Sequence, residues 1–178
     1  MSPIEYVQMK AFARIDGLLL AVLWVFSFVC YVVGLSNPLL SVLAMLLAVS
    51  TPFVVAKRLR KFRDVALQGS ISLMRGWAFV VFVFFYGSIL FALVLYAYFA
   101  YIDHGYVIQN LLQMLNAPET AEVISQYGLS ESMNISLEQL QSMRPIDLSL
   151  NILTSNIMLG IILGFPIGLM MRKDMSTK

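Results

Sequence analysis

Charged side chains are scarce in this chain of 178 residues: only 12% are Asp, Glu, Lys or Arg, and 60% are hydrophobic. Soluble globular domains carry about 25% charged residues. A soluble chain with so few charges would expose apolar patches large enough to drive association. The composition therefore excludes an ordinary soluble domain and predicts an integral membrane protein.

Cysteine and histidine are almost absent, with one of each. Cys30 lies inside an apolar run, and a single cysteine cannot form an intrachain disulfide. His104 follows Asp103, but a metal site needs further ligands that converge on it, and the spacing indicates none. The commoner role of such a pair is to cap a helix end. No phosphate-binding glycine loop and no HExxH, CxxC or GxSxG sequence occurs. We therefore predict no catalytic residue, no metal site and no cofactor.

Long apolar runs are what this chain has in abundance. Four of them come close to or exceed the roughly 20 residues that a helix needs to cross about 30 Å of hydrocarbon. We expect spans at about residues 17–35, 39–56, 77–102 and 146–171. The pattern predicts an all-α, polytopic membrane protein, in which a single membrane domain is a bundle of four transmembrane helices. A polar, partly helical insert at 103–145 separates the third and fourth spans.

The segments between the spans carry their own signals. Residues 34–38 (GLSNP) predict a compact turn, which makes the first two spans an antiparallel hairpin. Residues 68–72 (QGSIS) predict a break between an extension of the second span and the third span. In the insert, a short amphipathic helix is expected over 106–115. A second helix capped by Asn116 should end before Gly128, and a capping box at Ser136 should open a third.

Basic residues are missing from the first turn and nearly missing from the insert, which holds only Arg144. Lys and Arg near spans stay on the cytoplasmic side of a membrane. We therefore expect both termini and the segment after the second span in the cytoplasm, with the insert outside. That segment contains a basic run: Lys57, Arg58, Arg60, Lys61 and Arg63. The run should also attract anionic lipids, at about 1 kcal/mol per charge. Nucleic-acid binding is not expected of a run tethered at the bilayer.

The fourth span begins with polar side chains that cannot all face lipid, because an unsatisfied amide or hydroxyl in hydrocarbon costs free energy. These are Asp147, Asn151, Thr154, Ser155 and Asn156. The favoured interpretation is hydrogen bonding to the other spans, at about 0.6–2 kcal/mol for each bond. The alternative is a water-filled vestibule, open to the outside, that binds a polar headgroup or a small solute.

Glycines recur every four residues in the second half of the same span, at Gly160, Gly164 and Gly168. Small residues at this spacing let two helix backbones approach closely. This glycine stripe has two interpretations: packing inside the bundle, which we favour, or a seam for a homodimer or a membrane-protein partner.

Two short motifs carry a resemblance to a known family: Gly69-Ser70-Ile71-Ser72 before the third span, and Tyr101-Ile102-Asp103-His104-Gly105-Tyr106 after it. Together with the polar insert and the glycines of the last span, they make the chain resemble the bacterial membrane proteins known as domain of unknown function 4199. Because the family often has Pro where His104 stands, His104 is not expected to be a required ligand. The resemblance implies a four-span protein of a bacterial inner membrane and no particular activity.

Three functional hypotheses follow. The leading one is a non-enzymatic accessory protein of the inner membrane that packs against itself or a partner through the fourth span. The second is binding or transport of a lipid headgroup or small solute at the polar mouth around Asp147, Asn151 and Ser155. The third is an envelope enzyme that uses Asp103, His104 and Asp147.

Overall fold

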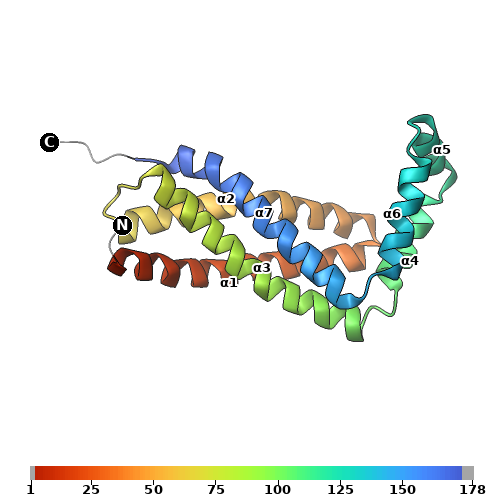
Figure 1. Cartoon of the computed structure of the whole chain (residues 1–178), viewed down its shortest axis with the longest axis horizontal. Helices are drawn as coiled ribbons and strands as arrows, with labels where there is room; N and C mark the ends of the chain where they lie inside the picture. Colours follow the sequence, from red (N-terminus) through yellow and green to blue (C-terminus); the bar gives the residue numbers. More distant parts are fainter. Residues whose placement is uncertain (1–2, 174–178) are drawn as a thin grey trace. The chain divides into compact units, whose positions relative to one another are not determined.

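The computed structural model describes residues 3–173, and all of its long elements are helices (Figure 1). The elements in chain order are α1 (Pro3–Gly34), α2 (Pro38–Ala66), α3 (Leu73–Tyr101), α4 (Tyr106–Leu115), α5 (Pro118–Gln126), α6 (Ser130–Ser142) and α7 (Pro145–Met171). Among them, α1, α2, α3 and α7 are long and apolar enough to cross a membrane. The expected all-α architecture, with four spans and a partly helical insert, is confirmed.

The chain divides into two compact units. The first consists of Met1–Val94 and Asn151–Lys178, and it contains α1, α2 and the larger parts of α3 and α7. The second is Leu95–Leu150, which holds the end of α3, the helices α4 to α6 and the start of α7. The first unit is therefore the helical bundle, and the second is built around the insert.

The turn between α1 and α2 is short because both helix ends are capped locally. The Asn37 side chain accepts a hydrogen bond from the Leu39 backbone N–H at 3.1 Å, and Pro38 occupies the first helical position, where no N–H is needed. Ser41 Oγ donates to the Gly34 carbonyl at 2.8 Å. A Cβ on Gly34 would lie 2.6 Å from Ser41, so only glycine fits there. The predicted hairpin turn is thus present.

Both helices of this hairpin are longer than the expected spans. The polar segment before the first span is helical from Pro3, and its Met9 and Ala13 are buried. Likewise α2 continues through the basic run, so that Leu59 and Phe62 are buried on its inner face. The chain then breaks at two residues with positive φ, Gln68 (52°) and Gly69 (88°). The break predicted for residues 68–72 is therefore confirmed.

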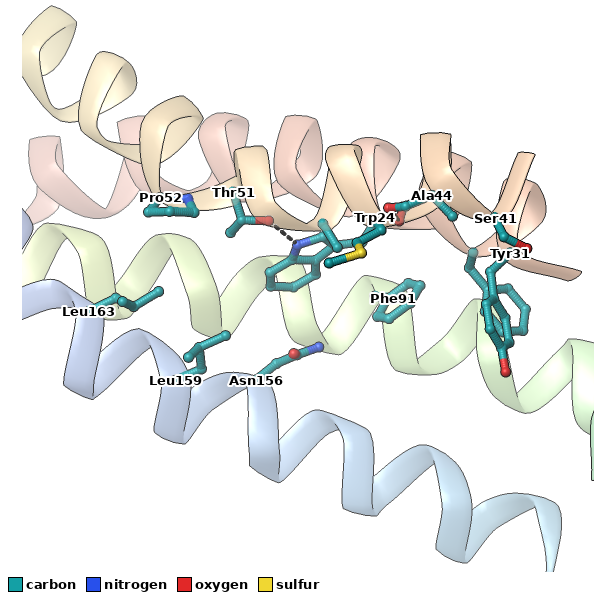
Figure 2. A pocket seen from close by; sticks show the side chains of 14 residues that line it. Trp24, Tyr31, Ser41, Ala44, Thr51, Pro52, Phe91, Asn156, Leu159 and Leu163 are labelled. Carbon is teal, nitrogen blue, oxygen red and sulfur yellow. Dashed lines mark hydrogen bonds between the residues drawn. The ribbon is translucent and has the colours of Figure 1, made fainter. Parts of the chain in front are cut away.

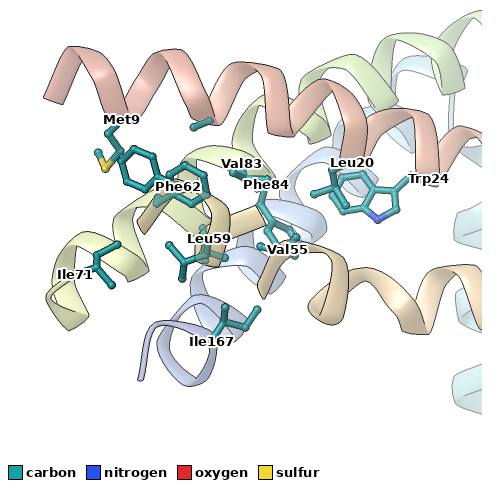
Figure 3. Close-up of a cluster of buried hydrophobic side chains, with 13 residues drawn as sticks. Met9, Leu20, Trp24, Val55, Leu59, Phe62, Ile71, Val83, Phe84 and Ile167 are labelled. Carbon is teal, nitrogen blue, oxygen red and sulfur yellow. The ribbon is translucent and has the colours of Figure 1, made fainter. Parts of the chain in front are cut away.

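The buried apolar cluster of the bundle comes from α1, α2 and α3, with Ile71 from the α2–α3 connector and Ile167 from α7 (Figure 3). Phe62 of α2 and Phe79 of α3 are stacked, with ring centroids 4.5 Å apart and an angle of 9° between the planes. The cluster consists of Met9, Ala13, Leu20, Trp24, Val55, Leu59, Phe62, Ile71, Phe79, Val80, Val83, Phe84 and Ile167. Much of it lies near the basic run, away from the α1–α2 turn, so the bundle is most tightly filled at that end.

Ion pairs and backbone bonds join the helix ends on the side of the basic run. Arg75 Nη2 of α3 donates to Glu5 Oε2 of α1 at 2.6 Å. Ile71 and Lys173 exchange two backbone hydrogen bonds, of 2.9 and 3.1 Å. Arg63 Nη1 donates to the Met171 carbonyl at 3.1 Å. These bonds fix the start of α1, the α2–α3 connector and the end of α7 to one another.

The deepest ion pair joins α1 to α2. Arg58 Nε donates to Asp16 Oδ1 at 2.6 Å, Arg58 Nη2 also reaches this oxygen, and only 3% of the Asp16 side chain is exposed. Asp16 lies about 27 Å along α1 from its end at Gly34, and Arg58 lies about 30 Å along α2 from Pro38. These lengths match the hydrocarbon thickness of roughly 30 Å. The pair therefore lies about one hydrocarbon thickness from the α1–α2 turn.

In the insert, the sequence predicted the first helix well and the third one wrongly. α4 spans the expected residues, and Gly128 has a positive φ of 66° just beyond α5. Asn116, however, ends α4, and the residue before α5 is Ala117, which has no side-chain cap. α6 begins at Ser130, so Ser136 lies inside the helix and donates to the Ser132 carbonyl at 2.8 Å. The capping box predicted at Ser136 was wrong, because a serine followed three residues later by Gln or Glu also occurs in the middle of helices.

Replacing Asp16 by Asn should destabilise the bundle more than any exposed charge change. Removing one partner of a buried pair costs about 3–5 kcal/mol, and the lower end applies because 26% of the Arg58 side chain is exposed. Unfolding in mixed micelles with a denaturing detergent measures the loss. The matched control is Asp64→Asn, where the carboxylate is 46% exposed, so solvent screens its ion pair and the expected loss of stability is much smaller. Equal stability of the two variants would contradict the structural role of the pair.

Candidate functional site

The first polar residue of α7 belongs to a helix cap. Asp147 Oδ2 accepts from Arg144 Nε at 2.8 Å and from the Arg144 backbone N–H at 3.2 Å, while Oδ1 accepts from Arg144 Nη2 at 3.0 Å. This hydrogen bonding, and the charge of the carboxylate, raise the pKa of the Arg144 guanidinium above its usual value. The carboxylate also compensates the positive end of the helix dipole. Asp147 therefore caps the N-terminus of α7.

Three of the other predicted polar residues point away from the bundle. Asn151, Thr154 and Ser155 are all exposed on α7. Ser155 Oγ donates to Asn151 Oδ1 at 3.5 Å, one helical turn away. The structure thus brings Asn151 and Ser155 together on the outer side of α7.

Asn156 is the member of this group that faces the interior. It is half-buried and lines a cavity of about 610 Å³ within the bundle unit (Figure 2). Residues of α1, α2 and α3 complete the lining, with Trp24, Thr51 and Phe91 among them. Of the five polar residues at the start of the fourth span, only Asn156 contributes to this cavity.

The glycine stripe is in contact with α3. A Cβ on Gly160 would overlap Phe84 Cβ, and one on Gly164 would lie 3.0 Å from Trp77 Cδ1. On Gly168 it would lie 3.1 Å from the Trp77 backbone nitrogen. Trp77 Nε1 also donates to the Ile161 carbonyl at 3.0 Å. The glycine stripe therefore packs against α3 within the bundle unit. The opposite side of α7 is the one left for contact with another molecule.

Asp103 and His104 form the corner between α3 and α4. Asp103 is 5% exposed, and its two carboxylate oxygens accept from the backbone N–H groups of Gly105 (3.0 Å) and Val107 (3.1 Å). His104 is exposed and has a positive φ of 45°, a conformation in which few residue types are common. Asp103 therefore satisfies the first N–H groups of α4, and His104 provides the change of chain direction.

No group of three or more His, Cys, Asp or Glu side chains that could hold a metal ion occurs among the described residues 3–173.

The basic run divides into two sets by helical position. Arg58 and Arg63 turn toward the bundle, where they bind Asp16 and the Met171 carbonyl. The other set is exposed: Lys57, Arg60 and Lys61. Within this outer set, Arg60 Nε lies 3.8 Å from Asp64 Oδ2, one helical turn away.

Sequence reasoning missed the Asp16–Arg58 pair and the cavity. The pair had a detectable signal, since Asp16 and Arg58 are almost equally far from the turn at 35–37, and antiparallel helices bring such positions together. The cavity had no such signal in the sequence, because it depends on which side of each apolar helix faces the bundle.

Comparison with known proteins gives a family and no further relative. A family model described as "Protein of unknown function (DUF4199)" matches residues 16–173, which is most of the chain. Neither the curated proteins nor the solved structures contain a match.

Substituting the glycines should show how closely α3 and α7 approach. Gly160→Ala places a methyl group inside the contact distance of Phe84, so we expect a loss of about 1–3 kcal/mol from overpacking. Gly164→Ala meets only the edge of the Trp77 ring at 3.0 Å and should cost less. Thermal unfolding in detergent compares the two variants. A Gly160→Ala variant as stable as the unmodified protein would rule out the close contact.

Proposed function

We propose a function for this chain from the premise that it belongs to the family of proteins of unknown function DUF4199. The chain is a multi-pass membrane protein. In the proposal it is a non-enzymatic accessory protein of a bacterial inner membrane, and it binds a membrane-protein partner or a second copy of itself through α7. The observation that carries this proposal is a pair of exposed polar side chains, Asn151 and Ser155, on the outer side of a membrane-spanning helix.

The proposed contact is the outward face of α7, a stripe of exposed side chains at helical spacing. It consists of Asn151, Ser155, Met158, Ile162, Phe165 and Leu169. The four apolar members are between 53% and 64% exposed. The glycine stripe on another side of α7 is already occupied by α3. A partner therefore meets this outward face and not the glycines.

The depth of the polar residues argues for a protein partner rather than lipid. α7 ends at Met171, and Arg172 follows it. Counting about 20 residues, or 30 Å, back from Arg172 places the far edge of the hydrocarbon near residue 152. Ser155 then lies about 5 Å inside the hydrocarbon, and Asn151 lies at its edge. Lipid chains offer no hydrogen bond to the exposed Ser155 hydroxyl, whereas polar groups of a neighbouring helix do.

The candidate catalytic residues support a non-enzymatic role. The Asp103 carboxylate is held by backbone N–H groups of the α3–α4 corner, and Asp147 is paired with Arg144. An acid or base in catalysis must reach the proton of a substrate. Each of these carboxylates instead caps the helix that follows it.

The proposed orientation has both termini and the α2–α3 connector in the cytoplasm. It is supported by the exposed set Lys57, Arg60 and Lys61, because Lys and Arg beside a span resist transfer across a membrane. Arg75 and Arg172 lie near the same end of the bundle unit. The insert, α4 to α6, is then extracytoplasmic.

A photo-cross-linking amino acid at Ser155 should give a protein adduct in native membranes, because this position faces the proposed partner. The matched control is Val49, which is 55% exposed on α2 and also faces outward. Mass spectrometry of the adducts identifies a second copy or another membrane protein. If Ser155 yields only lipid adducts, or the same adducts as Val49, the outward face is not a partner surface.

Cysteine labelling should test the orientation independently. In a Cys30→Ser background, Glu131→Cys in α6 and Lys61→Cys in α2 place one thiol on each exposed segment. An impermeant thiol reagent added to intact spheroplasts should label position 131, and position 61 only after permeabilisation. The opposite result would invert the proposed topology without affecting the helical bundle.

A further inference from the structure

The cavity in the bundle unit is a cleft with a buried floor and exposed walls. Trp24, Ser27, Ala44 and Thr51 form the floor and are all buried. The walls come from two helices: Met45 and Ala48 of α2, and Leu159 of α7, are exposed. Figure 2 shows α7 opposite α2, with Trp24 and Phe91 between them. The cleft therefore opens sideways between α2 and α7, toward the lipid that surrounds a membrane-spanning bundle.

The polar groups of the floor are already satisfied by one another. Trp24 Nε1 donates to Thr51 Oγ1 at 3.0 Å, and Ser27 Oγ donates to the Ala44 carbonyl at 2.8 Å. A water molecule needs two to four polar partners to occupy a cavity favourably. A small polar solute has the same requirement. The floor therefore presents apolar surface to an occupant, and Phe28, Phe91 and Leu163 extend that surface.

The length of the cleft matches one leaflet. It begins near the α1–α2 turn, at Tyr31 and Ser41, and ends at Pro52 and Leu163 (Figure 2). From Ser41 to Pro52 the distance along α2 is about 16 Å. Half of the roughly 30 Å hydrocarbon core is about 15 Å. An extended hydrocarbon chain that enters from the leaflet at the turn thus fits the cleft from end to end.

The cleft exists because α2 and α7 each use their close contacts elsewhere. α7 packs its glycines against α3, and α2 is bonded to α1 through Thr51 and Ala44. The short side chains of Ala44 in the floor and Ala48 in the α2 wall leave the cleft unfilled. The volume of about 610 Å³ falls within the range of about 300–1,000 Å³ that is typical of ligand pockets.

We infer that this cleft holds one acyl chain of a membrane glycerolipid as a resident ligand, from the leaflet on the side of the α1–α2 turn. The Asn156 amide lies in the α7 wall and the exposed Tyr31 lies at the entrance. The Tyr31 hydroxyl can donate to the ester oxygens where the chain joins the glycerol, whereas Asn156 lies farther along the cleft, near Trp24 (Figure 2). The inference does not depend on the proposed partner surface, because no residue of the outward face lines the cleft.

Quenching of tryptophan fluorescence tests this inference, because bromine quenches only at contact and Trp24 lies in the floor. The protein is reconstituted in phosphatidylcholine vesicles whose acyl chains carry bromine. Ala48→Phe fills the cleft from its exposed α2 wall and should remove the Trp24 share of the quenching, about half of the total for two tryptophans. The control Val49→Phe adds the same ring at an exposed position outside the cleft and should leave quenching unchanged.

Lipid retention distinguishes a resident chain from ordinary surrounding lipid. After extensive washing in detergent, native mass spectrometry of the unmodified protein and of Val49→Phe should show one retained glycerolipid, and Ala48→Phe should show at least tenfold less. Two results would overturn the inference: equal quenching of the Ala48→Phe and Val49→Phe proteins, or loss of all lipid from the unmodified protein while it remains folded.

Discussion

A buried carboxylate, Asp16, and the partly exposed guanidinium of Arg58 set the register of the first two helices. Transfer of either ion alone out of water costs several kcal/mol, so Asp16 and Arg58 stabilise the bundle only when they meet. The turn at residues 35–37 fixes the other end of the hairpin. Between these ends, Trp24 meets Thr51 and Ser27 meets the Ala44 carbonyl. Each pair is about as far from the turn on α1 as on α2, so one register satisfies all the polar groups at once.

The two faces of α7 differ in what they contact: one packs against α3, and the other is exposed. Glycines bring α7 close to α3, and this contact depends on van der Waals packing because lipid is as apolar as a protein interior. The polar side chains Asn151 and Ser155 lie on the outward side. Since α2 is fastened to α1 and α7 to α3, the two pairs of helices leave the cleft between α2 and α7. A partner surface and a lipid cleft are both compatible with this division.

Much of the fold follows from local sequence, whereas the site depends on long-range contacts. Apolar length predicted the four spans, and Asn37, Pro38 and Gly69 predicted where the helices stop, because caps and positive φ are properties of a few neighbouring residues. Polarity alone could not separate Asn156, which lines the cleft, from Asn151, which is exposed. Nor does it show that Arg58 faces inward while its neighbour Lys57 faces outward. Those directions are decided by helices that lie far away in the sequence.

The contact between the glycine stripe and α3 has a consequence for biosynthesis. Gly160 is synthesised 76 residues after Phe84, and a ribosome adds about 5–20 residues each second. The α1–α2 hairpin can form as soon as it leaves the translocon. The glycines of α7 that contact Phe84 and Trp77 are synthesised only several seconds after α3. During this interval the unfinished chain exposes an aromatic helix face within the bilayer. Nascent protein is therefore most open to wrong pairing, or to help from an insertion factor, just before its last helix emerges.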